Sequence, residues 1–130
     1  MKTQYLIDTQ TWLWWHISPD MLSSEQIEII ENGDNIIHFS VVSAWEINLK
    51  YRLERLRLPS LPSIYIPQRL NKSRMQVLAL ELEHSLSVEQ LPPYHNDPFD
   101  RFLIKQAQIN ELTILTNDRR FKSYDVGLVL

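Results

Sequence analysis

The chain has 130 residues, of which 44% are hydrophobic and 22% are charged, as expected for a single globular domain spanning residues 1–130. It contains no cysteine, which excludes disulfides, thiolate zinc sites and a cysteine nucleophile. The formal net charge of −3 gives the molecule as a whole no attraction for polyanions. No stretch approaches the roughly 20 apolar residues of a membrane span, so we expect a soluble, cytoplasmic protein without membrane contact.

Short apolar runs alternate along the chain with helical patterns. We expect strands over 4–7, 35–39, 75–80, 112–116 and 126–130. We expect helices over 10–17, 21–32, 41–54, 64–71 and 82–90, a further helix from residue 98, and a turn or short helix over 119–124. The proline-containing segment 57–63 is expected to be a connection. This alternation predicts an α/β domain, with four to five parallel strands covered on both faces.

One distinctive stretch, His-Asn-Asp-Pro-Phe-Asp-Arg, occupies residues 95–101. Asp97 is a favourable N-cap, and Pro98 suits the first helical position because its missing N–H does no harm there. Asp100 and Arg101 then fall in the first turn, where the backbone presents positive charge. A helix that opens with two carboxylates three residues apart can cap itself, and it can also hold a cation.

Three further acids lie near the ends of predicted strands. Asp8 ends the first strand, Asp118 follows the fourth, and Glu46 lies early in the helix after the second. Ligands of open parallel sheets bind beyond the carboxyl ends of the strands, so these acids should share one edge. Asp100 joins them if the loop 91–97 brings its helix start to that edge. Such a carboxylate group suits Mg²⁺ or Mn²⁺ acting on a phosphodiester.

The charges are unevenly distributed along the chain. Residues 50–74 carry seven Lys or Arg and one acid, whereas residues 1–49 carry seven acids and one Lys. A solvated helix face accounts for most of these basic residues when each is taken alone. Together, a basic segment beside an acidic one could also guide a phosphate backbone toward a metal ion.

Each acid also has a simpler interpretation. Asp8 could cap the next helix, and Glu46 could face the dipole of its own helix. Asp100 could be the return partner of Asp97 in a capping arrangement, and Asp118 could simply start a turn. We assign Asp97 mainly to capping.

The histidine and the tryptophans have simpler interpretations as well. His95 is expected to form hydrogen bonds within its loop rather than to act as a ligand or base. Trp12, Trp14 and Trp15 are expected to belong to the core or to a partner surface rather than to stack on bases.

Together these residues resemble the PIN-domain family, and in particular the VapC-type toxins of prokaryotic toxin–antitoxin pairs. The likeness covers nearly the whole chain, and residues 95–101 are its most specific part. The other markers are residues 6–9 with Trp15, residues 43–47 with Lys50, the pair 91–92, Ile104 with residues 106–107, and residues 115–118 with Phe121.

The resemblance implies a three-layer α/β/α sandwich and a Mg²⁺- or Mn²⁺-dependent endoribonuclease. The catalytic and metal-binding residues would be Asp8, Glu46, Asp100 and Asp118. The supporting residues would be Asp97 behind the helix start, Thr9 and Thr116 orienting carboxylates or water, and Arg101 contacting a phosphate. The resemblance also implies an RNA substrate, a homodimer and a small cognate antitoxin that covers the active-site groove.

Two other hypotheses stay open. A PIN-like module could bind RNA or a protein through aromatic and basic surfaces without turnover, although the presence of all four acids argues against it. A phosphatase or receiver domain with an aspartyl phosphate would also place acids at strand ends. Aspartyl phosphatases usually carry a second Asp two residues after the nucleophile, however, and here Gln10 follows Asp8 and Thr9.

Overall fold

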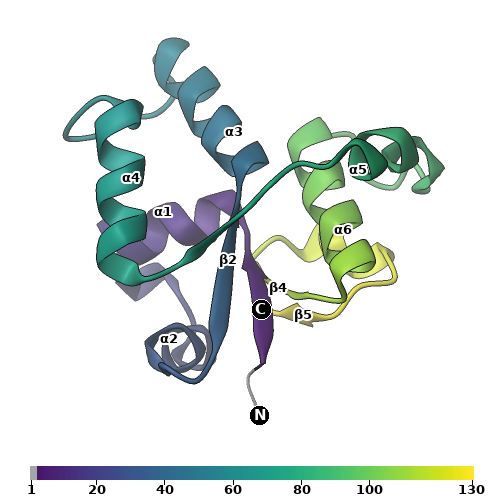
Figure 1. The fold of residues 1–130 in the computed structure, drawn as a ribbon, viewed down its shortest axis with the longest axis horizontal. Coiled ribbons are helices and arrows are strands. Elements are labelled where there is room, and N and C mark those ends of the chain that lie inside the picture. The colour runs from purple at the N-terminus through teal and green to yellow at the C-terminus, as the bar shows by residue number, and fades with distance from the viewer. Residues whose placement is uncertain (1–2) are drawn as a thin grey trace.

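A five-stranded parallel sheet lies at the centre of the computed structural model, which describes residues 3–130 (Figure 1). The strand order is β3-β2-β1-β4-β5, and every neighbouring pair is parallel. The strands are β1 (Gln4–Ile7), β2 (Ile36–Ser40), β3 (Gln76–Leu78), β4 (Thr113–Leu115) and β5 (Leu128–Val129). The prediction of a parallel sheet of four to five strands is confirmed.

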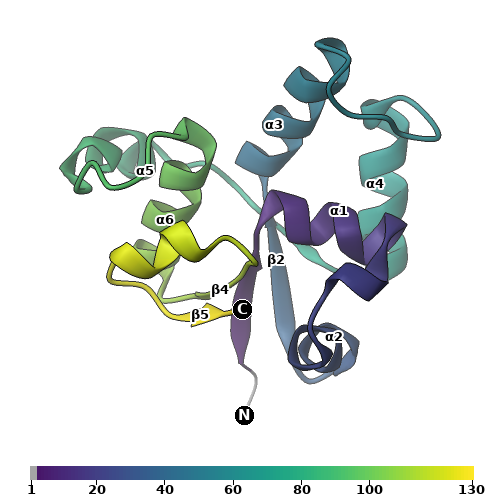
Figure 2. The same cartoon turned by 180° about the vertical axis from the view of Figure 1, so that it is seen from behind.

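Helices cover both faces of this sheet. The α-helices are α1 (Thr9–Ile17), α2 (Ser24–Glu31), α3 (Val41–Arg52), α4 (Pro62–Ser73), α5 (Leu82–Ser87) and α6 (Pro98–Asn110). Three 3₁₀ turns complete the chain, η1 (Pro19–Met21), η2 (Val88–Gln90) and η3 (Arg119–Ser123). Helices α1 to α4 lie on one side of the sheet, and α5 and α6 lie on the other (Figures 1 and 2). This is the predicted three-layer α/β/α sandwich.

The central strands are apolar throughout because each contributes to two cores. Leu6 of β1 and Ile114 of β4 are fully buried in the core beneath α6, whereas Ile7 and Leu115 are fully buried in the core beneath α1, α3 and α4. Neighbouring residues of one strand therefore point into opposite layers. This double burial explains the short apolar runs without polar alternation.

The order of the strands creates a switch point between β1 and β4. The chain moves outward from β1 to β2 and β3, and then returns through α5 and α6 to place β4 on the other side of β1. Ser40 at the end of β2 donates a 2.6 Å hydrogen bond to Gln106 of α6, which ties the two halves together. In a doubly wound sheet, the crevice beyond the carboxyl ends at such a point is the expected ligand site.

Some boundaries differ from the predicted ones. Helix α4 begins at Pro62 rather than at residue 64 and continues to Ser73, so the connection before it is shorter than the predicted 57–63. Pro62 stands at the start of the helix, where proline is favourable, so it does not interrupt it. The helix expected over 21–32 begins at Ser24, because Ser23 caps it in a reciprocal arrangement with Gln26. Across residues 3–130, we find no helix with the length and apolar character needed to cross a bilayer.

Candidate active site

Four acids from four different elements line a single cavity at the switch point. Asp8 follows β1, Glu46 belongs to α3, Asp100 lies in the first turn of α6, and Asp118 follows β4. They share a cavity of about 270 Å³ with Asp97, and we call it the acidic cavity. Asp8 and Glu46 are only 6% and 4% exposed. The structure thus brings together the four acids that the sequence places at one sheet edge.

The start of α6 is fixed by Asp97. Its Oδ1 accepts a 3.0 Å hydrogen bond from the backbone N–H of Asp100, which confirms its assignment as a cap. The carboxylate of Asp100 does not return to Asp97, so the capping alternative for Asp100 is wrong. Asp100 Oδ2 instead lies 2.7 Å from Nε2 of His95, and its carboxylate belongs to the acidic cavity.

Thr116 joins the ends of the two central strands. Its hydroxyl donates a 2.6 Å hydrogen bond to Oδ2 of Asp8 and accepts a 3.0 Å bond from the backbone N–H of Asp118. Thr116 therefore orients the carboxylate of Asp8 and the backbone of Asp118. Thr9 lies elsewhere, because its hydroxyl donates to Ser43 at 2.8 Å and links α1 to α3 rather than contacting a carboxylate.

The carboxylate of Glu46 is only half neutralised. Its Oε2 accepts from Nζ of Lys50, one turn further along α3. Its Oε1 is buried and has no hydrogen-bond partner within residues 3–130. Buried carboxylate oxygens normally have partners, so this orphaned atom marks a place for a cation or a donor that the protein itself does not supply.

Burial, together with the crowding of acids, raises the pKa of two of them. Burial raises the pKa of Asp100 to about 8, and the nearby carboxylates of Asp8, Asp97, Glu46 and Asp118 add to this effect. Burial also raises the pKa of Asp8 to about 6, although the Thr116 hydrogen bond opposes the shift. A divalent cation would favour the ionised form of both groups.

Comparison with known families identifies the family to which this chain belongs. The model of the PIN domain matches residues 5–127. The chain belongs to the PIN-domain family. Ribonuclease VapC22 of Mycobacterium tuberculosis (strain ATCC 25618 / H37Rv) is 25% identical over 123 residues, which cover 94% of this PIN domain chain and 92% of the relative. Ribonuclease VapC16 of the same organism is 32% identical over 62 residues, which cover 48% of this chain and 44% of that protein.

Solved structures share the fold. The structure of VapBC2 from Rickettsia felis, bound to a DNA fragment from its promoter, superposes with a TM-score of 0.71 at 17% identity and covers 98% of each chain. FitAcB from Neisseria gonorrhoeae superposes with a TM-score of 0.63 at 19% identity, over 100% of this chain and 97% of the other. These similarities confirm the PIN-domain architecture.

His95 forms hydrogen bonds within its loop, as predicted, and its ring also reaches two acids of the acidic cavity of this PIN domain. It is 3% exposed, and its Nε2 lies 2.7 Å from Asp100 and 3.7 Å from Asp118. Ligand atoms from these three residues lie within 4.8 Å of one another. The backbone N–H of Asp97 donates to Nδ1 of His95 at 3.4 Å, which leaves Nε2 to donate to Asp100. Burial lowers the pKa of His95, which favours this neutral form.

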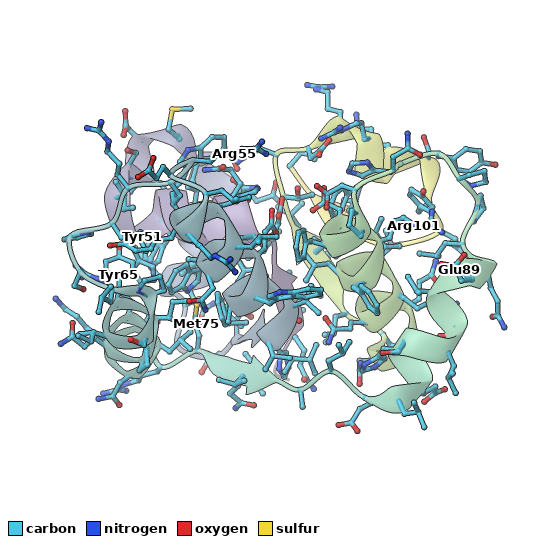
Figure 3. All side chains as sticks on the ribbon, turned by 90° about the horizontal axis from the view of Figure 1, so that it is seen from above. Tyr51, Arg55, Tyr65, Met75, Glu89 and Arg101 are labelled. Atoms are coloured by element: carbon cyan, nitrogen blue, oxygen red, sulfur yellow. The ribbon has the colours of Figure 1, made fainter. Side chains whose placement is uncertain are left out.

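Arg101 is placed differently from its predicted role. Its guanidinium donates to the carbonyl oxygens of Val88, Leu91 and Pro92 at 3.0–3.3 Å. Figure 3 shows Arg101 on the side of α6 that faces Glu89, away from α3. The structure thus gives Arg101 a structural role in place of the predicted phosphate contact, because its two terminal nitrogens hold the loop that leads into α6.

Arg120 is the arginine at the acidic cavity, and sequence reasoning missed it. Its Nε lies 3.0 Å from Asp118 Oδ1, and its Nη2 lies 2.8 Å from Oδ2. This paired contact lowers the pKa of Asp118. A basic residue two positions after an acid in a turn is a signal that could have identified the pair.

Proposed function

We propose that this PIN domain is a metal-dependent endoribonuclease and the toxin of a type II toxin–antitoxin pair. The observation that carries the proposal is the convergence of Asp8, Glu46, Asp100 and Asp118 on one cavity. The names of the relatives, Ribonuclease VapC22 and Ribonuclease VapC16, support RNA as the substrate.

The donor set fits a hard divalent cation. The four acids offer only oxygen ligands, which suit Mg²⁺ or Mn²⁺. The unpartnered Oε1 of Glu46 and the raised pKa values of Asp8 and Asp100 both indicate negative charge that the protein leaves uncompensated. We propose that these four acids hold the ion, which would supply Lewis-acid activation of water and of the phosphodiester.

The surrounding side chains position the reacting groups. Thr116 fixes the carboxylate of Asp8, and His95 fixes that of Asp100. Lys50 and Arg120 bring positive charge to the wall of the acidic cavity, where they would bind the non-bridging oxygens of the scissile phosphate. Hydrolysis joins the water oxygen to phosphorus and breaks the bond to the 3′ oxygen. A carboxylate of the cavity accepts the proton of water, and the departing 3′ oxygen takes a proton from solvent. One product then carries a 5′-phosphate and the other a 3′-hydroxyl.

The proposal is tested by RNA cleavage with added Mg²⁺ or Mn²⁺ and with EDTA. Asp8→Asn and Asp100→Asn should abolish both cleavage and the heat of Mn²⁺ binding, because each removes a ligand charge. Asp20→Asn, at an exposed position in η1, serves as the matched control and should behave as the parent protein. Cleavage that persists in both cavity variants and in EDTA would refute the proposal.

We further propose that a small antitoxin binds this protein in the cytoplasm and that the toxin forms a homodimer. Support for a protein partner comes from a groove between α3 and α4, where Trp45 is 57% exposed and Leu61 is 55% exposed. Apolar side chains gathered in this way are typical of interaction surfaces. Co-purification with the product of a neighbouring small gene, followed by light scattering of the complex, tests both statements.

A further inference from the structure

Part of the acidic cavity carries no charge. Its wall includes Gln10, Thr11 and Trp14 from α1, together with Asn117 from the turn after β4. Gln10 and Trp14 stand four residues apart on α1, so their side chains lie on the same side of this helix. Helix α1 begins directly after Asp8, so this uncharged wall adjoins the carboxylates.

Trp14 lies outside both hydrophobic cores, unlike Trp12 and Trp15. Trp12 is fully buried in the core beneath α1, and Trp15 packs against that same core. Trp14 belongs to neither of the buried clusters found within residues 3–130, and it has no aromatic partner there. A large planar side chain thus lines the cavity from outside both cores.

Polar groups beside Trp14 are also unused. The Nδ2 atom of Asn117 and the Oγ1 atom of Thr11 are buried without hydrogen-bond partners among the described residues. Gln10 is exposed, so its amide is accessible to a ligand in the cavity. Buried amides and hydroxyls are normally satisfied, so this wall presents binding groups that the protein does not use internally.

We propose that Trp14 and Gln10 form a subsite for one nucleobase adjacent to the scissile phosphate. This inference rests on the proposed ribonuclease function and identifies residues that set its specificity. The indole offers a flat apolar face on which any base can stack. The Gln10 amide both donates and accepts hydrogen bonds, so it can distinguish the edges of different bases. Asn117 would donate to the base or to the adjoining phosphate.

The geometry also limits the form of the substrate. A base can stack on Trp14 only after it has left its own stack and its pairing partner. The acidic cavity, at about 270 Å³, lies just below the size range of pockets that enclose small ligands, so it suits one nucleotide rather than a duplex. The base beside the cleavage point is therefore unpaired.

The experiment measures cleavage of a short unstructured oligoribonucleotide in Mn²⁺ by the full-length protein. Trp14→Ala should raise KM by roughly 5- to 150-fold, the range that loss of one stacked base produces. Trp14→Phe should restore most of the affinity because it keeps an aromatic face. Gln10→Ala should change the ratio of cleavage among oligonucleotides that differ only in the base beside the cut.

Two further measurements distinguish loss of a base subsite from damage to the metal site and from a general effect of removing a large side chain from α1. Mn²⁺ binding by calorimetry should be the same in Trp14→Ala and the parent, which shows that the metal ligands are intact. Ile17→Ala, at an exposed position of the same helix outside the cavity wall, is the matched control and should keep the parent KM. An unchanged KM in Trp14→Ala, with an unchanged base preference in Gln10→Ala, overturns the proposal.

Fluorescence gives a test that does not depend on catalysis or on the folding of Trp14→Ala. The oligoribonucleotide should quench the tryptophan fluorescence of the parent protein. Trp14→Phe should lose the part of this quenching that comes from Trp14. If no variant cleaves RNA, the proposed function fails, whereas the subsite is still supported by quenching that depends on Trp14. Equal quenching in the parent and in Trp14→Phe overturns the subsite.

Discussion

His95 and Asp100 form the closest contact between an imidazole and a carboxylate in the described part of the chain, with 2.7 Å between Nε2 and Oδ2. Two hydrogen bonds, one to the backbone and one to the ring, fix the position of His95. Its backbone N–H donates to the Tyr124 hydroxyl at 2.8 Å, and its Nδ1 accepts from the backbone of Asp97. The imidazole therefore presents a fixed donor to a carboxylate of the acidic cavity.

Replacing His95 with Gln should weaken metal binding without unfolding the protein. Loss of a group that orients a metal ligand typically costs roughly 10- to 100-fold in metal affinity or activity, and we expect a loss in this range for Mn²⁺. Calorimetry at a fixed pH and cleavage of RNA provide the measurements. His38→Gln, outside the acidic cavity, is the control. An unchanged Mn²⁺ affinity in His95→Gln would show that Asp100 needs no such support.

Asp100→Asn should stabilise the metal-free protein while it destroys the metal site. Burial and neighbouring acids raise the pKa of Asp100 from 3.8 to about 8, so the folded state resists its ionisation. This penalty grows as the pH rises from the unfolded value through the folded one, and it is fully present above pH 8. Removing the charge at that pH should raise the melting temperature, and relief of about 1 kcal/mol corresponds to roughly 3–6 °C for a domain of this size.

The comparison must be made in EDTA and again in Mn²⁺. Excess Mn²⁺ should raise the melting temperature of the parent but not that of Asp100→Asn, because only the parent retains the full ligand set. Asp20→Asn should leave both melting temperatures unchanged. A metal-free Asp100→Asn variant that melts below the parent at pH 8 would contradict the electrostatic account.

The affinity for Mn²⁺ should fall steeply between pH 8 and pH 6. Metal and proton compete for Asp100, whose pKa is raised to about 8, and for Asp8, whose pKa is raised to about 6. Together these groups predict a loss of roughly 100-fold over this interval. Calorimetry in buffers of different ionisation enthalpy should detect protons released on binding. An affinity that is constant over this range would show that both acids are already ionised without metal.

The strand ends of this fold could be predicted from the sequence. Each central strand is a short apolar run that stops at a polar residue, Asp8 for β1 and Thr116 for β4. Parallel pairing places those ends on one edge, so the meeting of Asp8 with Asp118 follows from topology. Asp97 could be predicted as a cap because the preference for Asp before Pro at a helix start is local chemistry.

Contacts that depend on loop paths or on helical phase could not be predicted in the same way. The approach of His95 to Asp118 depends on the course of the loop before α6, which has no periodic pattern. Three tryptophans within four positions of α1 all suit a core, and a rotation of about 100° per residue decides that Trp12 enters it while Trp14 lines the cavity. Arg101 follows Asp100 in the sequence, yet that same rotation turns its guanidinium toward the loop.

Arg101→Met should reduce stability rather than substrate affinity. Three carbonyl oxygens, those of Val88, Leu91 and Pro92, lose a charged donor, and bonds to charged groups contribute roughly 1.5–3 kcal/mol. We expect the free energy of unfolding, measured in urea, to fall by about 2–4 kcal/mol. Arg119→Met, at an exposed position, should change it little. A variant with parent stability but a raised KM for RNA would restore the phosphate-contact interpretation, because only a side chain that reaches the substrate can alter binding without loosening the loop.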